Sequence, residues 1–276
     1  MNFFVRLAKA VFLPAWTGLM LILDNKGVLL ATTKIELKKR YSGSFMGKVW
    51  VVLYPTLFLA IYLFVYLVVF KMRFPGYSEL DYVVYVFSGL VPFIGLMESL
   101  NTGVVSIKQN MHLVKNILFP IELIPVRVVL ISMVSEFVGL GLLLILAGTN
   151  GSLSFQLVML AYAILLQFLF LMGLVWFFAA VGILVPDMGY FVGLFMLFLL
   201  FVSPIGFKPD MVSGSASIMV YGNPVFYMTE PFRISVIDSY IINYKVLLVS
   251  TVMSVFSFIL GAAFFHRFKM FLVDYE

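Results

Sequence analysis

The sequence predicts an all-α polytopic membrane protein with six transmembrane helices, and three observations lead to this fold class. Hydrophobic residues make up 63% of the chain and charged residues only 11%, and the mean hydropathy is +1.11, which leaves too little polar surface for a water-soluble globule. The apolar residues gather into segments of about 20 residues, the length that a helix needs to cross a hydrocarbon core. Runs such as 140–147 and 191–202 are apolar on every side, which favours helices over the alternating strands of an outer-membrane barrel.

The chain divides into an N-terminal cytoplasmic or interfacial segment, residues 1–48, and one transmembrane domain, residues 49–276. The first segment opens with an apolar run, residues 10–23, that is interrupted by Pro14 and is too short to cross the bilayer comfortably. We therefore expect an interfacial or re-entrant helix over residues 3–23, with a seventh span as the alternative. The six expected spans are 50–70, 82–106, 121–147, 155–185, 188–206 and 246–265.

Residues 28–41 have the pattern of an amphipathic helix. One face carries Leu30, Thr33, Leu37 and Tyr41 at helical spacing. The other face is basic, and basic side chains bind the anionic headgroups of a cytoplasmic leaflet. We expect this helix to lie flat on the membrane, with its charge supplied by Lys34, Lys38, Lys39 and Arg40.

The connections between the spans differ in length and polarity. Residues 107–120 can form a short cytoplasmic helix, which Pro120 would end. Residues 148–154 form an uncharged outer loop, and Pro186 with Asp187 favours a tight inner turn. The outer region before the last span contains two apolar pieces, 211–221 and 223–238, each too short to cross the membrane. They predict two short re-entrant or interfacial helices at the outer mouth.

The distribution of charge predicts the orientation of the chain. With the N-terminus in the cytoplasm, most of the 18 basic residues lie on that side, whereas the basic residues on the outer side are matched by nearby acidic ones. This asymmetry follows the positive-inside rule and places both termini in the cytoplasm. The net charge of +5 is thereby explained by topology, and no nucleic-acid partner is expected.

No pattern of residues predicts catalysis, a metal site or a bound nucleotide. The chain has no cysteine, and His112 and His266 lie apart from any cluster of possible ligands. The string at residues 43–49 is similar to a phosphate-binding loop, but it is one residue short between its glycines and lacks the Ser or Thr that holds magnesium. If ATP drives this protein, another subunit hydrolyses it.

Two glutamates fall well inside the expected spans, away from their ends, where an ionisable side chain costs a few kcal/mol. Glu98 lies in the inner third of the second span and Glu136 near the middle of the third. Each could contact a transport path or act in gating. The alternative is a structural glutamate that hydrogen-bonds to a polar residue such as Asn101 or Ser135.

The first span carries an aromatic residue at every fourth position. This spacing forms one ridge on a helix, suited either to packing in a groove or to lining a conduit. Aromatic rings can stack on the apolar faces of sugars, and tyrosine hydroxyls can exchange hydrogen bonds with sugar hydroxyls. Packing against lipid and core is the alternative. The ridge consists of Tyr54, Phe58, Tyr62, Tyr66 and Phe70.

The second short outer helix predicts a polar gate. Glu230 and Arg233 are three residues apart, so they can form an ion pair on one helical face. Pro231 between them indicates that the helix begins or bends there. The alternative is a local salt bridge, which contributes little when exposed. The full set of gate candidates is Asn223, Pro224, Tyr227, Glu230 and Arg233.

Taken in order, several motifs resemble those of ABC-2 type permeases that export polysaccharides. Residues 36–41, followed by Ser44, Gly47 and Trp50, resemble the start of such permeases. Residues 113–116 and 119–125 resemble their loop after the second span. Glu98 stands where such permeases often carry a glutamate, and residues 223–233 resemble their late signature. The resemblance runs from about Val28 to the C-terminus. The extension before Val28 and Pro231 depart from the family pattern.

The resemblance implies the membrane subunit of an O-antigen, teichoic acid or capsule exporter in a bacterial inner membrane. Two permeases would pair with two ATPases, which would carry the ATP and magnesium, with no cofactor on this chain. A pair of copies is also plausible because six such helices make a thin wall for a hydrophilic polymer. The implied coupling helix lies within residues 106–118, and the candidate contacts to the ATPase are Lys108, Asn110, Leu113, Lys115, Asn116 and Phe119.

The leading function is therefore export of a lipid-linked polysaccharide, and two alternatives stay open. The same fold could export a small hydrophobic drug or a lipid, which would require a dry lateral pocket instead of a continuous polar or aromatic tunnel. A lipid-sugar transferase would require acid, base or metal ligands clustered at one face, and the sequence shows none.

Overall fold

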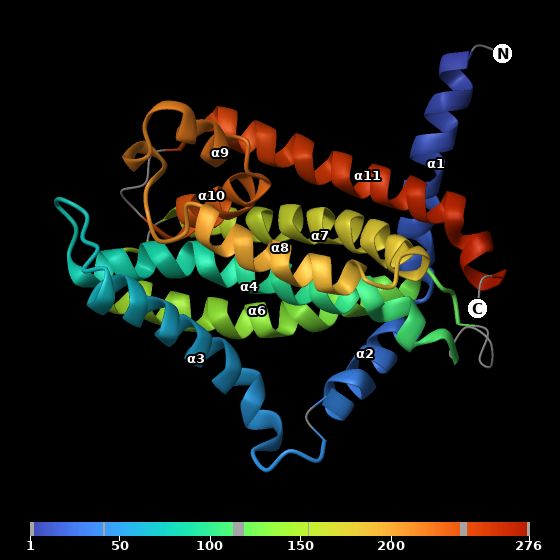
Figure 1. The fold of residues 1–276 in the computed structure, drawn as a ribbon, viewed down its shortest axis with the longest axis horizontal. Coiled ribbons are helices and arrows are strands. Elements are labelled where there is room, and N and C mark those ends of the chain that lie inside the picture. The colour runs from blue at the N-terminus through green and yellow to red at the C-terminus, as the bar shows by residue number, and fades with distance from the viewer. Residues whose placement is uncertain (1–2, 41, 113–118, 154, 238–241, 275–276) are drawn as a thin grey trace.

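The computed structural model describes residues 3–40, 42–112, 119–153, 155–237 and 242–274, and every regular element among them is helical. The predicted fold class is confirmed (Figure 1). Five helical stretches are long and apolar enough to cross a membrane. They are Gly47–Val69, which contains α3 (Trp50–Leu63) and the π-helical turn η2 (Phe64–Val69), then α4 (Glu79–Gln109), α6 (Leu123–Thr149), Phe155–Leu184, which contains α7 (Met159–Leu184), and α11 (Tyr244–Asp274).

The remaining expected span, 188–206, corresponds to α8, Met188–Val202, which is shorter than predicted. Its 15 residues fall below the ~20 that a crossing needs, so a sixth crossing stays a prediction. The helix ends before Ser203, whose backbone is extended. Ser203 is followed by Pro204, and steric clash with a proline disfavours the helical conformation of the residue before it.

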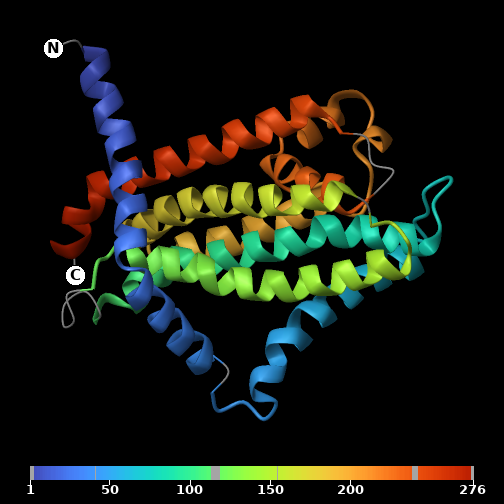
Figure 2. The same cartoon turned by 180° about the vertical axis from the view of Figure 1, so that it is seen from behind.

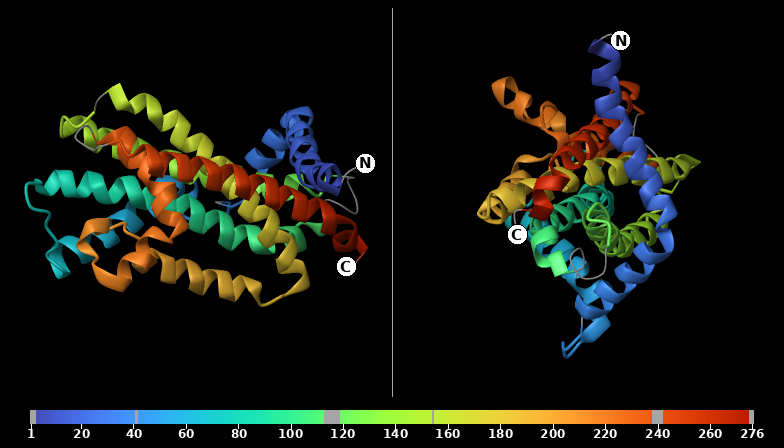
Figure 3. Two further views of the ribbon diagram at one scale, coloured as in Figure 1. Left: turned by 90° about the horizontal axis from the view of Figure 1, so that it is seen from above. Right: turned by 90° about the vertical axis from the view of Figure 1, so that its right-hand side faces the viewer.

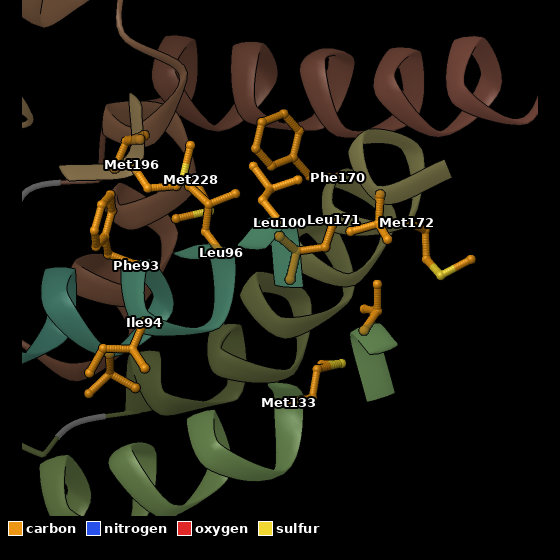
Figure 4. Packing of buried hydrophobic residues seen from close by; sticks show 14 of the residues in the cluster. Phe93, Ile94, Leu96, Leu100, Met133, Phe170, Leu171, Met172, Met196 and Met228 are labelled. Carbon is orange, nitrogen blue, oxygen red and sulfur yellow. The ribbon is translucent and has the colours of Figure 1, made fainter. Parts of the chain in front are cut away.

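Helix α4 is the centre of the bundle. Of its most apolar window, 83% is buried, compared with 22% for the stretch that contains α3. It packs against α6 and α7 along its length, and α10 lies across one end. Figure 4 shows Met196 of α8 and Met228 of α10 beside Phe93 of α4.

The N-terminal helices lie across one end of the bundle. Helix α1 (Phe3–Asp24) crosses the C-terminal half of α11 at a steep angle, and α2 (Lys26–Arg40) continues past α6 (Figures 1 and 2). The apolar part of α1 that the structure describes in full, Phe12–Asp24, is too short to cross a membrane. The transverse direction supports an interfacial helix over a seventh span.

The two ends of the bundle carry different segments. The α1 end holds α1, the C-terminus, the start of α8 and the ends of the segment between α4 and α6 (Figures 1 and 3). The opposite end, here called the α10 end, holds the turn before α4, the turn after α6, and α10 (Figures 1 and 2). Segments that charge assigns to the cytoplasm thus share one end, and those assigned to the outside share the other.

The outer region differs from the two helices that the sequence predicts. The first piece contains only α9 (Ser217–Tyr221), after the 3₁₀ turns Pro209–Met211 and Gly214–Ala216. Gly214 adopts a φ of +68°, a left-handed conformation that interrupts a helix. The second piece is α10 (Pro224–Val236), which begins where the Asn223 side chain accepts a hydrogen bond from the Val225 N–H.

Pro231 does not begin α10, because it lies inside the helix. A proline at this position removes the hydrogen bond to the carbonyl of Tyr227. That carbonyl instead accepts a hydrogen bond from the Ser250 hydroxyl of α11 at 2.5 Å. The unusual proline is therefore compensated by a contact that also fixes α10 to α11.

Candidate functional site

Charged side chains at the α1 end connect α2 to the bundle. Arg40, the last residue of α2, forms an ion pair with Glu98 of α4. The Glu98 side chain is only 8% exposed, so the interfacial helix supplies the counter-charge that this glutamate needs in an apolar environment. Glu98 therefore belongs to an interhelical contact at the α1 end.

A second contact at this end joins three elements through Arg127. This residue lies in the second turn of α6 and is 3% exposed. Its Nη2 donates a hydrogen bond of 2.6 Å to Oδ1 of Asn110 and lies 4.0 Å from Oε2 of Glu36 on α2. Asn110 is the residue that ends α4. One buried guanidinium thus contacts the end of α4 and the amphipathic helix from its place in α6.

A third contact holds the other end of the segment between α4 and α6. Nζ of Lys269 lies 2.8 Å from Oε1 of Glu122, and Nε1 of Trp176 donates to the Glu122 carbonyl at 3.1 Å. Lys269 comes from α11 and Trp176 from α7. Residues 110 and 122 are therefore each tied to the bundle, so a force on the intervening chain would be transmitted to α6, α7, α11 and α2.

The six candidate coupling residues lie in different settings. Lys108 is exposed in the last turn of α4, Asn110 is half-buried, and Phe119 is buried against the permease core. Leu113, Lys115 and Asn116 lie outside the described residues. A role for all six in ATPase docking stays a prediction.

The aromatic ridge passes from the surface into the protein. Tyr54 is 47% exposed and Phe58 is half-buried, whereas Tyr62 and Tyr66 are buried and stack with ring centroids 4.6 Å apart. Tyr66 packs so closely on Gly206 that no side chain would fit there. The buried hydroxyl of Tyr62 has no hydrogen-bond partner among the described residues. Such a hydroxyl can bind water or a passing polar group.

Glu136 lies at the centre of the bundle, where its carboxyl group packs against Gly95, about one turn along α4 from Glu98. Its Oε2 accepts a hydrogen bond of 2.8 Å from Nε2 of Gln167, which also donates to the Pro92 carbonyl at 3.0 Å. Gly95 of α4 leaves the space that the carboxyl group fills. Glu136 has a polar partner on a neighbouring helix, as the structural interpretation requires, but the partner is Gln167 and not Asn101 or Ser135.

The gate candidates gather at the α10 end around Arg233, which is completely buried. Its Nη1 donates to Oε1 of Glu230 at 2.8 Å, and Nη2 donates to the carbonyls of Pro204 and Ile205. The guanidinium also lies 4.1 Å from the ring centroid of Tyr85 on α4. Glu230 and Arg233 thus form a local salt bridge, but it is buried, and it belongs to a junction between α10, α4 and the chain after α8.

The remaining gate candidates surround this junction. Asn223 donates from Nδ2 to the Ser203 hydroxyl at 2.9 Å, and Pro224 is the first residue of α10. The Tyr227 hydroxyl donates to the Tyr221 carbonyl at 2.9 Å. The five residues are brought together in space, and whether they open and close a path stays a prediction.

Sequence reasoning missed Arg127, Gln167 and Tyr85 as members of these sites. Two of them carried a signal, since Gln167 is the sole amide within α7 and Arg127 is the sole cation within α6. A lone polar residue in an apolar helix is expected to face a partner. Tyr85 carried none, because tyrosine is frequent along this chain.

Comparison with known proteins identifies relatives over most of the chain. The model of the ABC-2 type transporter family matches residues 28–237. The chain is 25% identical over 211 residues to the O-antigen export system permease protein RfbA of Myxococcus xanthus, covering 75% of this chain and 79% of that protein. A protein of the same name from Klebsiella pneumoniae is 24% identical over 245 residues, covering 88% and 92%. All of α1 and all of α11 lie outside the family match.

Proposed function

Because the chain belongs to the ABC-2 type transporter family, we propose that it is the permease subunit that exports a lipid-linked, O-antigen-like polysaccharide across a bacterial inner membrane. ATP and magnesium would bind to a separate ATPase dimer, and the α1 end would face the cytoplasm. The observation that carries the coupling part of this proposal is that both ends of the segment between α4 and α6 are held by cations, Arg127 at Asn110 and Lys269 at Glu122.

These contacts suggest how movement would enter the membrane. An ATPase that displaces the segment between α4 and α6 would pull on Asn110 and thereby on Arg127. Arg127 would carry the displacement into α6 and toward Glu36 of α2, and Arg40 would carry it between α2 and Glu98 of α4. The amphipathic helix would then move together with the inner ends of α4 and α6.

The transport path would lie against α3. This stretch is mostly uncovered in one copy of the chain, with Ile61 and Phe64 exposed on it. A second copy related by a two-fold axis would cover such a face and enclose a passage. The aromatic ridge, with Tyr54 at the surface and Tyr62 below it, would then offer rings and hydroxyls to the sugar chain.

The alternatives have weaker support. A dry lateral pocket, which export of a drug or a lipid requires, does exist, but it lies between α1, α7 and α11, away from α3. A lipid-sugar transferase would need clustered ligands or acid–base groups. No group of three or more His, Asp or Glu residues that could hold a metal occurs in the part of the chain that the structure describes.

Complementation tests the proposal. In cells that make a lipid-linked polysaccharide but lack its permease, this chain expressed with its own ATPase should restore polysaccharide at the cell surface. The Arg127→Met variant should be inserted in the membrane but should restore much less. Polysaccharide that stays inside the cell while a fluorescent hydrophobic dye is extruded would instead support the drug-export alternative.

A further inference from the structure

An apolar groove of about 920 Å³ opens on the side of the bundle between α1, α7 and α11. Figure 2 shows these three helices, with α1 crossing over α11. Leu13 and Pro14 of α1 form one wall, Phe177 of α7 another, and Phe256 and Leu260 of α11 the third. Several of these side chains are partly exposed, so the groove is open to whatever surrounds the protein.

The floor of the groove is rigid. Gly173 of α7 and Gly261 of α11 let the two backbones touch, since a Cβ on either would overlap the backbone of the other helix. The Ser257 hydroxyl donates to the Phe170 carbonyl at 3.0 Å across the same seam. Close approach through small residues and an interhelical hydrogen bond is how helices associate firmly in membranes.

The α1 wall is also held in place. The indole ring of Trp176 lies 3.3 Å from the position of a Cβ on Gly18, so α1 seats directly on this ring. Trp176 is itself fixed by its hydrogen bond to the Glu122 carbonyl. Residues 13–17 precede the region that the family model matches, residues 28–237.

The rim of the groove toward the α1 end is positively charged. His266 and Arg267 of α11 line it, both are exposed, and neither makes an ion pair or a hydrogen bond within the described residues. The rest of the lining is apolar except for two hydroxyl groups. The groove thus offers a cation at one end and hydrocarbon surface along the remainder.

We infer that this groove binds an anionic glycerophospholipid from the leaflet on the α1 side, with its phosphate at Arg267 and its acyl chains between α1 and the α7–α11 seam. Arginine pairs with phosphate at a membrane surface, and apolar side chains take the place of neighbouring lipid tails. The bound lipid would join α1 to α11 at the end where the coupling contacts lie. This inference requires a membrane location but no particular cargo.

The size of the groove favours a lipid over a second copy of the chain. Its volume falls within the range of about 300–1,000 Å³ that small-molecule sites occupy. A stable protein interface instead needs about 800 Å² from each partner, which is a broad surface and not a narrow trough. The lone cation at one end also matches a single anionic headgroup.

Native mass spectrometry of the full-length protein in detergent would test this inference. The probes are phosphatidylglycerol and phosphatidylcholine with identical acyl chains, added in equal titrations. We expect tighter binding of phosphatidylglycerol, and Arg267→Gln should weaken it about fivefold, which corresponds to the ~1 kcal/mol that one basic residue contributes at an anionic surface. The matched control is Lys245→Gln on the same helix, which lies outside the groove and should leave binding unchanged.

Phosphatidylglycerol with a photoactivatable acyl chain would locate the site. Crosslinks should map to residues 253–264 of α11 or to residues 13–17 of α1, and Ala263→Leu, which reduces the volume of the groove, should lower their yield. Size-exclusion chromatography would verify that each variant is folded. Equal affinity for the two lipids, equal loss in both glutamine variants, or crosslinks elsewhere would overturn the inference.

Discussion

The two ends of the bundle hold their charged residues in contrasting ways. At the α1 end, each ion pair between separate helices has at least one partner that is 30–39% exposed, as in Arg40 with Glu98, Arg127 with Glu36, and Lys269 with Glu122. At the α10 end, the helix-joining contact is Arg233 with Glu230, which are 0% and 5% exposed and lie on one helix, whereas the pair of Arg73 with Glu79 at the start of α4 is exposed and serves as a comparison within that end. Exposed pairs contribute about 0–1 kcal/mol, whereas breaking a buried pair costs about 3–5 kcal/mol. The first arrangement suits contacts that must change during a transport cycle, and the second suits a fixed junction.

The largest expected effect concerns which side of the membrane each end faces. The chain contains no cysteine, so a single introduced thiol reports its own position. Cysteine in place of Thr149, exposed at the α10 end, should react completely with an impermeant reagent added to intact cells. Cysteine in place of His112, exposed at the α1 end, should react only after the membrane is opened. The reverse pattern would invert the proposed orientation.

Arg233→Met should have the next largest effect, on folding. It removes the group that pairs with Glu230 and that binds the carbonyls of Pro204 and Ile205. We expect a loss of about 3–5 kcal/mol in the free energy of unfolding, seen as a lower Tm and poor recovery from the membrane. The control is Arg73→Met, which breaks an exposed pair with Glu79 and should change stability by less than about 1 kcal/mol. Similar values for both would show that the buried junction contributes no more than an exposed pair.

Arg127→Met should act mainly on coupling. The hydrogen bond to Asn110 involves a charged donor, and such bonds contribute about 1.5–3 kcal/mol, so we expect roughly a tenfold loss of ATPase stimulation in the reconstituted complex. Arg127→Lys keeps the charge but not the planar fork, and should give an intermediate value. Full stimulation in a folded Arg127→Met complex would exclude this residue as the link between the segment and α6.

Tyr62→Phe should distinguish a packing role of Tyr62 from a role in transport. The hydroxyl is buried without a partner among the described residues, so its removal should leave the Tm unchanged or slightly raised. Export of polysaccharide should nevertheless slow if this hydroxyl contacts the sugar chain. A lower Tm together with normal export would instead indicate that the aromatic ridge serves in packing.

Lys269→Gln should have a small effect on both stability and coupling. Its pair with Glu122 is partly exposed, so the free energy of unfolding should fall by less than about 1 kcal/mol. ATPase stimulation should fall less than in Arg127→Met, because Trp176 still holds the Glu122 carbonyl. A larger loss of stimulation than in Arg127→Met would show that the α11 contact dominates the coupling.

Agreement between prediction and structure depended on whether a feature is local. The spans follow from hydropathy, because only hydrocarbon-length apolar helices avoid unpaired backbone groups in lipid, and five helical stretches that are long and apolar enough to cross lie within a few residues of the predicted limits. The span that corresponds to α8 was predicted too long because the apolar composition continues past Val202, whereas the helix ends before Pro204. The place of Pro231 inside α10 was not predicted, because the donor that compensates for it, Ser250, lies on another helix.

The sequence by itself determined the lipid environment and the all-α fold class and predicted the orientation of the chain, since burial in lipid and the positive-inside rule act on composition along short stretches. Only the tertiary structure decided which polar groups meet: Glu98 with Arg40, Glu136 with Gln167, and Arg127 with Asn110. Partners of a buried polar group are selected by distance in space, and residues separated by 17 to 58 positions come within hydrogen-bonding reach only after the helices have packed.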